Sequence, residues 1–249
     1  MTDNLSPADT AKLAAAERAV SFVQDGMRLG LGTGSTAAWM VRCLGRRVRD
    51  EGLQIVGVPT SEQTAVLARA EGIEIVTLEE AGWLDLTIDG ADEFDGDLNL
   101  IKGGGGALLR EKIVASASDR MIVIADAGKH VAQLGDFPLP VEVIRFGWQS
   151  TRDQIAELLE EFDVARREIT LRLRDDVPFV TDEGNYILDL ELGQIADPRH
   201  LALLLNQIPG TVENGLFIDL CDLAIVGHVD GNVTLVERTE DDDGFDNAV

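Results

Sequence analysis

The chain has 249 residues, 45% of them hydrophobic, which is enough to bury one large core or a core and a half. Its formal net charge of −24 argues against nucleic acid or an anionic membrane surface as a partner, because proteins meet both with lysine and arginine. No apolar run approaches the roughly 18–20 residues that span a bilayer, and from the polar N-terminus we expect no signal peptide. Two cysteines, Cys43 and Cys221, form no CxxC pattern, so we expect a reduced, cytoplasmic protein.

The first half of the chain alternates short apolar runs with helical ones. Ser6 before Pro7 predicts the start of a first helix, which ends at Asp25-Gly26. The apolar runs lack polar alternation, which is typical of strands buried on both faces. We predict strands at 27–32, 53–58, 73–76, 84–89 and 121–126, with helices at 36–49, 61–71 and 106–118. This order indicates βαβ units and a Rossmann-like parallel sheet with helices on both faces.

The pattern changes at Pro138 and Pro140. The following elements read as strand 141–146, helix 151–161, strands 168–174 and 186–192, helix 198–207 and strand 211–217, which is the ferredoxin-like order βαββαβ. Two last strands, 220–227 and 233–238, are expected to rejoin the first sheet. We therefore predict a Rossmann-like domain of residues 1–137 and 218–240, an inserted ferredoxin-like α+β domain of residues 138–217, and a disordered acidic tail of residues 241–249.

Polar loops follow three of the predicted strands, at the edge where parallel sheets bind ligands. They read TGST at 33–36, DGAD at 89–92 and DAGK at 126–129. The hydroxyls of the first loop could join free N–H groups at a helix start and hold a phosphate, although a plain capped turn would look the same. The segment GLGTGST is not a dinucleotide motif, because Ser35 stands where the third glycine is needed.

The run IKGGGGALLREK at 101–112 places four glycines after Lys102. It is not a P-loop, in which the lysine follows the glycines. Residues 95–106 begin like a calcium loop, but Leu100 and Gly106 replace the required glycine and glutamate. The three histidines are isolated, so we expect neither a metal nor a cofactor.

Candidate chemical groups are an acid in the helix after the glycines, two acids at the sheet edge, and the lysines. Glu111 lies between Ala107 and Ala115 at helical spacing, a small-residue face that a small ligand could approach, although most such acids face solvent. Asp89 and Asp92 could be turn formers or site residues. Lysine is scarce, with only Lys12, Lys102, Lys112 and Lys129, and most of these lie near the loops. Lysine suits a phosphate or a developing oxyanion.

Five motifs in order, GLGTGSTA, DGADE, IKGGGGALLREK, IADAGK and FPLPVEV, closely resemble ribose-5-phosphate isomerase of type A. The similarity runs from about residue 5 to 238. It implies an aldose–ketose isomerase of the non-oxidative pentose phosphate pathway that interconverts D-ribose 5-phosphate and D-ribulose 5-phosphate through a cis-enediol. It also implies a homodimer or homotetramer, and the acidic composition resembles that of halophilic members. A sugar-phosphate sensor on the same scaffold, or a related amino-sugar phosphate deaminase, are the alternatives.

The resemblance also implies roles for individual residues. Glu111 would be the base, Asp89 would assist ring opening, and Lys102 would complete the catalytic group. Substrate contacts would come from Thr33, Gly34, Ser35, Thr36, Asp89, Gly90, Ala91, Asp92, Lys102, Gly103, Gly104, Gly105, Lys129 and Lys12. Gly106 stands where some members carry alanine, so we expect glycine there to be neutral or slightly loosening. Burial would raise the pKa of Glu111 and the nearby lysines would lower it, and the sequence leaves the balance open.

Overall fold

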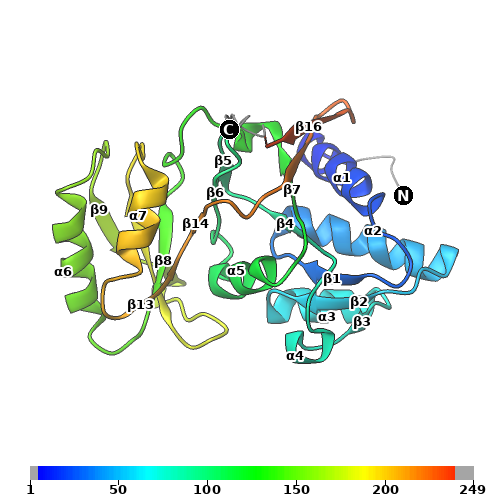
Figure 1. Ribbon diagram of the computed structural model, residues 1–249, viewed down its shortest axis with the longest axis horizontal. Helices are drawn as coiled ribbons and strands as arrows, with labels where there is room; N and C mark the ends of the chain where they lie inside the picture. The colour runs from blue at the N-terminus through cyan, green and yellow to red at the C-terminus, as the bar shows by residue number, and fades with distance from the viewer. Residues whose placement is uncertain (1–4, 239–249) are drawn as a thin grey trace, which may run out of the picture.

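The computed structural model describes residues 5–238, so the predicted tail of residues 241–249 lies outside the described residues. The main sheet has seven strands in the order β16-β15-β7-β4-β1-β2-β3, all parallel except β16 (Figure 1). In chain order they are β1 (Arg28–Leu31), β2 (Val56–Pro59), β3 (Glu74–Ile75), β4 (Leu86–Gly90), β7 (Met121–Asp126), β15 (Leu223–Gly227) and β16 (Val233–Glu237). The predicted parallel sheet is confirmed. From β1 the chain proceeds outward in both directions, so the gap between β1 and β4 is the switch point where such sheets bind ligands.

Helices cover both faces of this sheet. One face carries α1 (Pro7–Val20), α2 (Ser35–Glu51) and α3 (Glu62–Ala70), and the other carries α4 (Leu78–Ala81) and α5 (Leu108–Ser116). The buried residues of β7 divide between two cores, with Ile122 and Ile124 on the α1 side and Met121 and Val123 on the other. Strands buried on both faces explain why the sequence shows continuous apolar runs.

The first helix shows how composition sets packing distance. Ser6 accepts a hydrogen bond from the N–H of Asp9, as its N-cap position predicts. The buried face of α1 consists of four alanines and Val20, and the small alanines allow the helix to lie close to β15. A Cβ on Gly227 would fall 1.9 Å from the carbonyl oxygen of Ala11, so this contact requires glycine.

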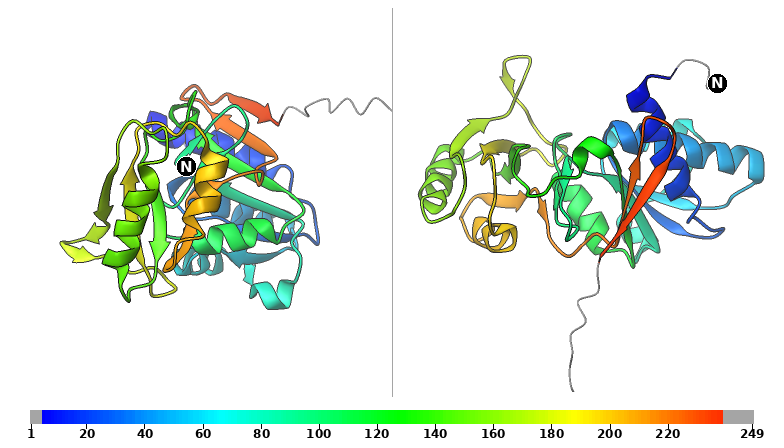
Figure 2. Two further views of the ribbon diagram at one scale, coloured as in Figure 1. Left: turned by 60° about the vertical axis from the view of Figure 1, so that its left-hand side comes forward. Right: turned by 90° about the horizontal axis from the view of Figure 1, so that it is seen from above.

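A second, smaller unit lies beside the main sheet (Figure 2). It contains β8 (Leu139–Val143), α6 (Trp148–Leu159), β9 (Glu168–Leu171), β12 (Tyr186–Glu191), α7 (Pro198–Leu205) and β13 (Thr211–Asn214), in the antiparallel order β13-β8-β12-β9. This confirms the predicted βαββαβ order. The predicted strand 168–174 is wrong as one element, because the chain leaves the sheet at Arg172 to form a hairpin of β10 (Leu173–Arg174) and β11 (Val177–Pro178). Asp175 and Asp176 turn this hairpin with φ of 53° and 61°.

A three-stranded sheet that the sequence did not predict lies between the two units. It joins β5 (Glu93–Phe94), β6 (Leu100–Ile101) and β14 (Leu216–Phe217). The predicted strand 211–217 is therefore two strands in two sheets. Strands of two residues carry no detectable periodicity, which is why β5 and β6 escaped prediction. Through β14, the end of the small unit pairs with the segment that leads into Lys102, whose N–H donates to the Gly215 carbonyl.

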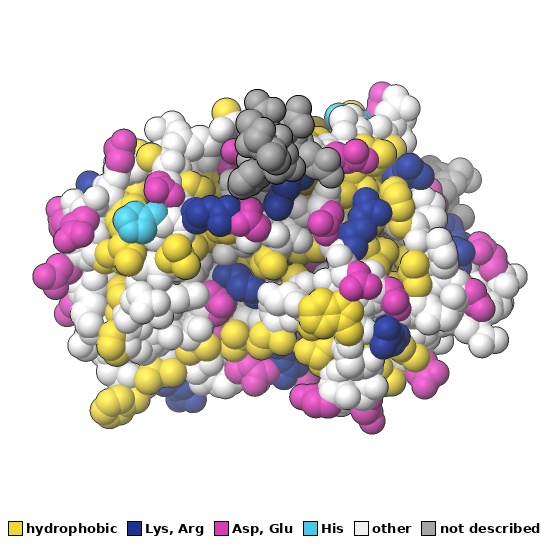
Figure 3. All heavy atoms as spheres, in the orientation of Figure 1, with side chains coloured by type: hydrophobic (Ala, Val, Ile, Leu, Met, Phe, Trp, Pro, Cys, Tyr) yellow, Lys and Arg dark blue, Asp and Glu magenta, His cyan; other side chains and the backbone are white. Residues whose placement is uncertain are grey.

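Local conformation also shortens one predicted helix. The helix expected at 106–118 begins at Leu108, because Gly106 has φ of +84° and Ala107 is the N-cap. Acidic side chains are spread across the face of the molecule seen in Figure 3, in keeping with the net charge of −24. Within residues 5–238, no helix combines the length and apolar character needed to cross a membrane.

Candidate functional site

A cavity of about 330 Å³ opens at the carboxyl ends of β1, β4 and β7 and is closed by the glycine turn that follows β6. Its lining consists of Lys12, Thr33, Gly34, Ser35, Thr36, Gly90, Ala91, Asp92, Lys102, Gly103, Gly105, Glu111, Asp126 and Lys129. The structure thus brings together every predicted site residue except Asp89 and Gly104. Asp89 is fully buried beside the cavity, and Gly104 faces solvent next to it. Asp126 was not predicted, although it opens the DAGK loop that the sequence analysis singled out.

The first loop ends at an uncapped helix N-terminus. Gly34, with φ of +108°, is the N-cap of α2 and offers no side chain, so the first N–H groups of the helix remain available to an anion. Lys12 Nζ lies 3.0 Å from Ser35 Oγ and brings a positive charge from α1 to the same place. Helix dipole, N–H groups, hydroxyls and ammonium together form a site suited to phosphate.

The Thr33 hydroxyl does not belong to that set of donors. Its Oγ1 lies 2.7 Å from Thr60 Oγ1 and 2.9 Å from Ser61 Oγ, on the side of β2 and α3. The backbone N–H of Thr33 donates to Asp89 Oδ1 at 3.0 Å. Thr33 therefore anchors the loop, whereas Ser35 and Thr36 are left to offer their hydroxyls to a ligand.

Three buried charges meet at the base of the cavity. Lys102 Nζ lies 3.0 Å from Asp89 Oδ2 and 3.3 Å from Glu111 Oε1, and it donates to the carbonyl of Gly90. The side chains of Lys102, Asp89 and Glu111 are 2%, 0% and 6% exposed. One ammonium cannot fully compensate two carboxylates in a buried site, so one carboxylate must bind its proton more tightly than usual.

The distribution of donors indicates that this proton belongs to Glu111. Asp89 Oδ1 accepts the N–H groups of Thr33 and Gly90, and its Oδ2 faces Lys102. Glu111 Oε2 and Asp89 Oδ2 are both buried without a hydrogen bond among the described residues, but Asp89 Oδ2 lies 3.0 Å from Lys102, and no backbone N–H of the described residues donates to Glu111. Burial raises the pKa of Glu111 to about 8, against Lys102, which lowers it, and with Asp89 and Asp92, which raise it further. The balance that the sequence left open is therefore decided by burial.

The pKa values of the other two members respond to the same environment. Burial raises the pKa of Asp89 above its ordinary value, while Lys102 and the two N–H donors work against it. Burial by itself would lower the pKa of Lys102, but the carboxylates of Asp89 and Glu111 prevail and raise it. Lys102 is consequently a permanent cation at neutral pH, placed to stabilise negative charge on a ligand oxygen.

The glycine turn is tightly built rather than loose. The N–H of Gly104 donates to Asp92 Oδ2 at 2.7 Å, and the N–H of Gly106 donates to the Gly103 carbonyl at 2.9 Å. Gly103 has φ of +110°, and a Cβ on Gly106 would lie 2.4 Å from Phe179 Cζ. The expectation that glycine at Gly106 is neutral is wrong for this chain, since the positive φ and the Phe179 ring both disfavour a side chain.

The lysines separate cleanly by position. Lys12, Lys102 and Lys129 line the cavity. Lys112 instead binds Glu213 Oε1 at 2.9 Å and the Asn214 carbonyl at 2.6 Å, which ties α5 to β13 of the small unit. Within residues 5–238, no three His, Cys, Asp or Glu side chains are grouped so that they could hold a metal ion.

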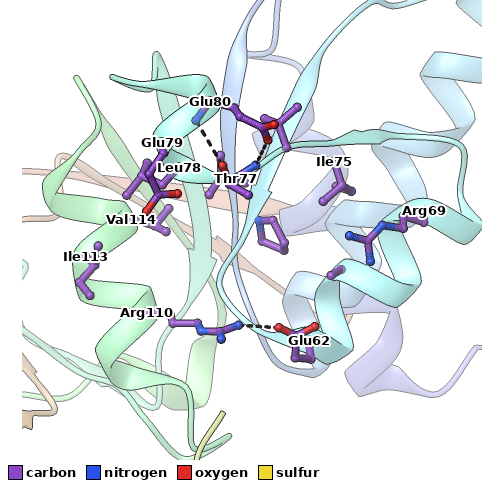
Figure 4. Close-up of a pocket in the computed structure, with 14 residues that line it drawn as sticks. Glu62, Arg69, Ile75, Thr77, Leu78, Glu79, Glu80, Arg110, Ile113 and Val114 are labelled. Carbon is purple, nitrogen blue, oxygen red and sulfur yellow. Dashed lines mark hydrogen bonds and ion pairs between the residues drawn. The ribbon is translucent and has the colours of Figure 1, made fainter. Parts of the chain in front are cut away.

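A second and larger cavity, of about 450 Å³, lies between α3, α4 and α5 (Figure 4). Arg110 points from α5 toward Glu62 on α3, and Thr77 and Glu80 cap the start of α4. Ile113 and Val114 supply part of the apolar wall. None of the predicted site residues lies in this cavity.

Comparison with known proteins places these features in a family. Residues 56–231 match the family model for ribose 5-phosphate isomerase A (phosphoriboisomerase A). A ribose-5-phosphate isomerase A of Cereibacter sphaeroides is 72% identical over 235 residues, 94% of this chain and 90% of that protein. The solved ribose 5-phosphate isomerase A of Methanocaldococcus jannaschii is 41% identical, with a TM-score of 0.85 over 93% of this chain and 100% of that one. A solved D-ribose-5-phosphate isomerase in complex with phospho-erythronic acid is 40% identical, with a TM-score of 0.86 over 93% and 99% of the two chains.

Proposed function

The chain belongs to the ribose 5-phosphate isomerase A family, and we propose that its 330 Å³ cavity performs the proton transfer of that reaction with Glu111 as the base. The enzyme interconverts D-ribose 5-phosphate and D-ribulose 5-phosphate. The observation that carries the proposal is the buried Oε2 of Glu111, which has no partner among the described residues and belongs to a cavity that also contains the phosphate-type site.

The substrate phosphate binds at the N-terminus of α2. The support is the uncapped helix start at Gly34, with the hydroxyls of Ser35 and Thr36 and the ammonium of Lys12 around it. Lys129 adds a further positive charge from the loop after β7. The relative that holds phospho-erythronic acid supports a ligand of this kind, a short polar chain ending in phosphate.

Isomerisation requires removal of a proton from the carbon next to a carbonyl. Glu111 in its ionised form takes the proton from carbon 2 of the open-chain aldose, which gives a cis-enediolate with its negative charge on O1. The hydroxyl proton of O2 then passes to O1, and Glu111 returns its proton to carbon 1, so that carbon 2 becomes the ketone and Glu111 is ionised again. Lys102, always charged, stabilises the enediolate oxygen together with the N–H groups of the glycine turn. A pKa of about 8 makes Glu111 a stronger base than an exposed carboxylate and still partly ionised at neutral pH.

The two aspartates have different tasks in this proposal. Asp92 lines the cavity and is held by the Gly104 N–H, so it is the carboxylate that can touch the sugar hydroxyls and assist ring opening. Asp89 lies behind the cavity wall and contributes to ring opening indirectly. It fixes Lys102 through their ion pair and fixes the phosphate loop through the Thr33 N–H.

The test of the proposal is Glu111→Gln, which keeps the side-chain size and removes the base. We expect kcat to fall by about 10²- to 10⁴-fold, the usual contribution of a positioned acid or base, while D-ribose 5-phosphate still binds in calorimetry. The matched control is Glu79→Gln in the second cavity, which should leave kcat unchanged. Turnover of Glu111→Gln close to that of the wild type would refute the assignment.

We also propose that the catalytic domain comprises residues 1–137 and 218–240, with residues 138–217 inserted as a ferredoxin-like domain. Support comes from the return of β15 and β16 to the main sheet after the small sheet is complete. At the second boundary, near residue 217, β14 pairs with β6, so the end of the inserted domain is joined to the catalytic domain by a strand pair. Limited proteolysis tests the boundaries, and cleavage inside β8 or β13 before cleavage at the domain junctions would contradict them.

The remaining proposals concern the environment of the enzyme. We propose that it is a cytoplasmic homodimer or homotetramer whose acidic surface suits high salt. Two buried, free cysteines support a reducing compartment, and the net charge of −24 supports screening by salt. Melting should shift to higher temperature between low and molar KCl, and sedimentation should report the oligomer. Melting that ignores salt would remove the argument for halophilic adaptation.

A further inference from the structure

Arg172 reaches from the small unit onto the glycine turn of the catalytic cavity. It lies between β9 and β10, and its side chain is only 15% exposed. Its Nη1 donates to the Gly103 carbonyl at 2.7 Å and, more weakly, to the Gly104 carbonyl at 3.2 Å. Neither the motifs nor the resemblance assigned any task to this residue.

The guanidinium is held in a fixed orientation. Its Nε donates to Asp189 Oδ2 at 2.8 Å, and its Nη2 donates to the other carboxylate oxygen of Asp189, a bidentate pair. Asp189 belongs to β12, and its side chain is 17% exposed. With Nε and Nη2 bound to this carboxylate, the plane of the guanidinium is fixed, and its Nη1 donates to the glycine carbonyls.

Each of these carbonyls shares its peptide unit with the N–H of the residue that follows. The unit with the Gly103 carbonyl carries the Gly104 N–H, which donates to Asp92 Oδ2 at 2.7 Å. The unit with the Gly104 carbonyl carries the Gly105 N–H. Within residues 5–238, the N–H groups of Gly103 and Gly105 make no hydrogen bond, and both residues line the cavity. A cation on the carbonyl end of a peptide strengthens its N–H as a donor.

We propose that Arg172, oriented by Asp189, is a positioning residue of the isomerisation. It fixes and polarises the peptide units of the glycine turn, so that one N–H holds the Asp92 carboxylate and the next is presented to a substrate oxygen. This inference rests on the proposed role of the cavity as the isomerisation site. It makes the small unit a working part of the active site, although none of its side chains lines the cavity.

A purely structural role for Arg172 would give different kinetics. If the arginine only joined the two units, its loss would lower the melting temperature and leave kcat of the folded enzyme unchanged. If it positions donors for the transition state, kcat falls while KM changes little, because the phosphate site at α2 is untouched. Measuring kcat, KM and the melting temperature separately therefore distinguishes the two roles.

The experiment compares Arg172→Gln, Arg172→Lys and the control Arg167→Gln in the full chain. Arg167 is a matched control, because it also donates to two backbone carbonyls, those of Leu159 and Phe162, but away from the cavity. For Arg172→Gln we expect kcat to fall about 10- to 100-fold, as for other residues that orient catalytic groups, with KM within about 3-fold of the wild type. Arg172→Lys should be intermediate, because an ammonium keeps the charge and lacks the fork.

Should Arg172→Gln fail to fold, since it leaves Asp189 without its partner, Arg172→Lys decides the matter. A folded variant at Arg172 with wild-type kcat overturns the inference, and so does an equal loss of kcat in Arg167→Gln. The Glu111→Gln variant, measured alongside, keeps the two proposals distinguishable. Loss of activity in Glu111→Gln with normal activity in Arg172→Lys would refute only the positioning role.

Discussion

Helix α5 separates two cavities that differ in kind. The smaller one holds Lys102 and Glu111, both almost completely buried, and a carboxylate oxygen without a partner. The larger one has its charges at the rim, where the side chain of Glu62 is 70% exposed and that of Arg110 30%. Volume and buried charge point to different cavities. Our proposal follows the buried charge, because burial among other charges is what shifts the pKa of a carboxylate toward a catalytic range.

The two cavities also differ in the residues that they receive from α5, which are neighbours in the sequence. Arg110 and Glu111 are consecutive, so they point about 100° apart around α5 and face different cavities. Arg110 is surrounded by Glu62, Asp182 and Glu183, which compensate its charge at the surface. Glu111 shares one lysine with a second carboxylate in a buried site. Sequence position therefore says little about chemistry until the helix is docked on the sheet.

The largest effect that we expect from the difference between the two cavities is a pH dependence of kcat/KM, set by the buried carboxylate of the smaller one. In the proposed mechanism Glu111 must be ionised to act as the base, so kcat/KM should fall about tenfold per pH unit below the Glu111 pKa of about 8 and level off above it. Measurements of kcat/KM between about pH 5 and 10 test this. The control variant Glu79→Gln should show the same fall at acidic pH as the wild type. A flat profile down to about pH 6 would contradict the raised pKa.

The raised pKa of Glu111 also makes the free energy of unfolding fall as the pH rises. Because its folded pKa lies above the ordinary 4.5, Glu111 stabilises the fold fully below pH 4.5, and this contribution is lost as the pH rises through about 8. Denaturation of wild type and Glu111→Gln across that window shows the difference. We expect the variant to lack this part of the decline.

The glycine turn offers an effect of intermediate size. Gly106→Ala should lower the free energy of unfolding by about 1–2 kcal/mol, because φ of +84° disfavours a Cβ and the Phe179 ring occupies its place. Gly105→Ala is the matched control, since its Cβ would lie 3.6 Å from Thr33 Cγ2, an ordinary contact. Chemical denaturation measures both. Equal losses in the two variants would mean that strain at Gly106 is not the cause.

The smallest effect should come from the larger cavity. Arg69→Gln changes an exposed residue in its lining, so kcat/KM should stay within about 2-fold of the wild type and stability within about 0.5 kcal/mol. Steady-state kinetics and thermal melting are sufficient to check this. A tenfold loss of kcat/KM would show that the second cavity communicates with the first through α5.

Much of the site was predictable because its residues lie in local motifs. The loops at 33–36 and 89–92 follow β1 and β4, which are neighbours at the switch point of the sheet. The strand order alone therefore predicts that these two loops lie close together. Asp126 could have been named from the same reasoning, since it ends β7. Arg172 carried no local signal, because its contacts are to backbone carbonyls about seventy residues earlier in the chain.

The sequence by itself determined the order of the longer strands and helices, the polar loops at the strand ends and the residue types that chemistry requires there. These properties depend on short-range periodicity and on composition, which are written in consecutive residues. Only the tertiary structure decided that burial raises the pKa of Glu111, that Asp89 stands behind the cavity while Asp92 faces it, and that a small antiparallel sheet holds the glycine turn through Arg172. The desolvation of a side chain and its long-range hydrogen bonds depend on which residues surround it, and these neighbours are known only once the chain has folded.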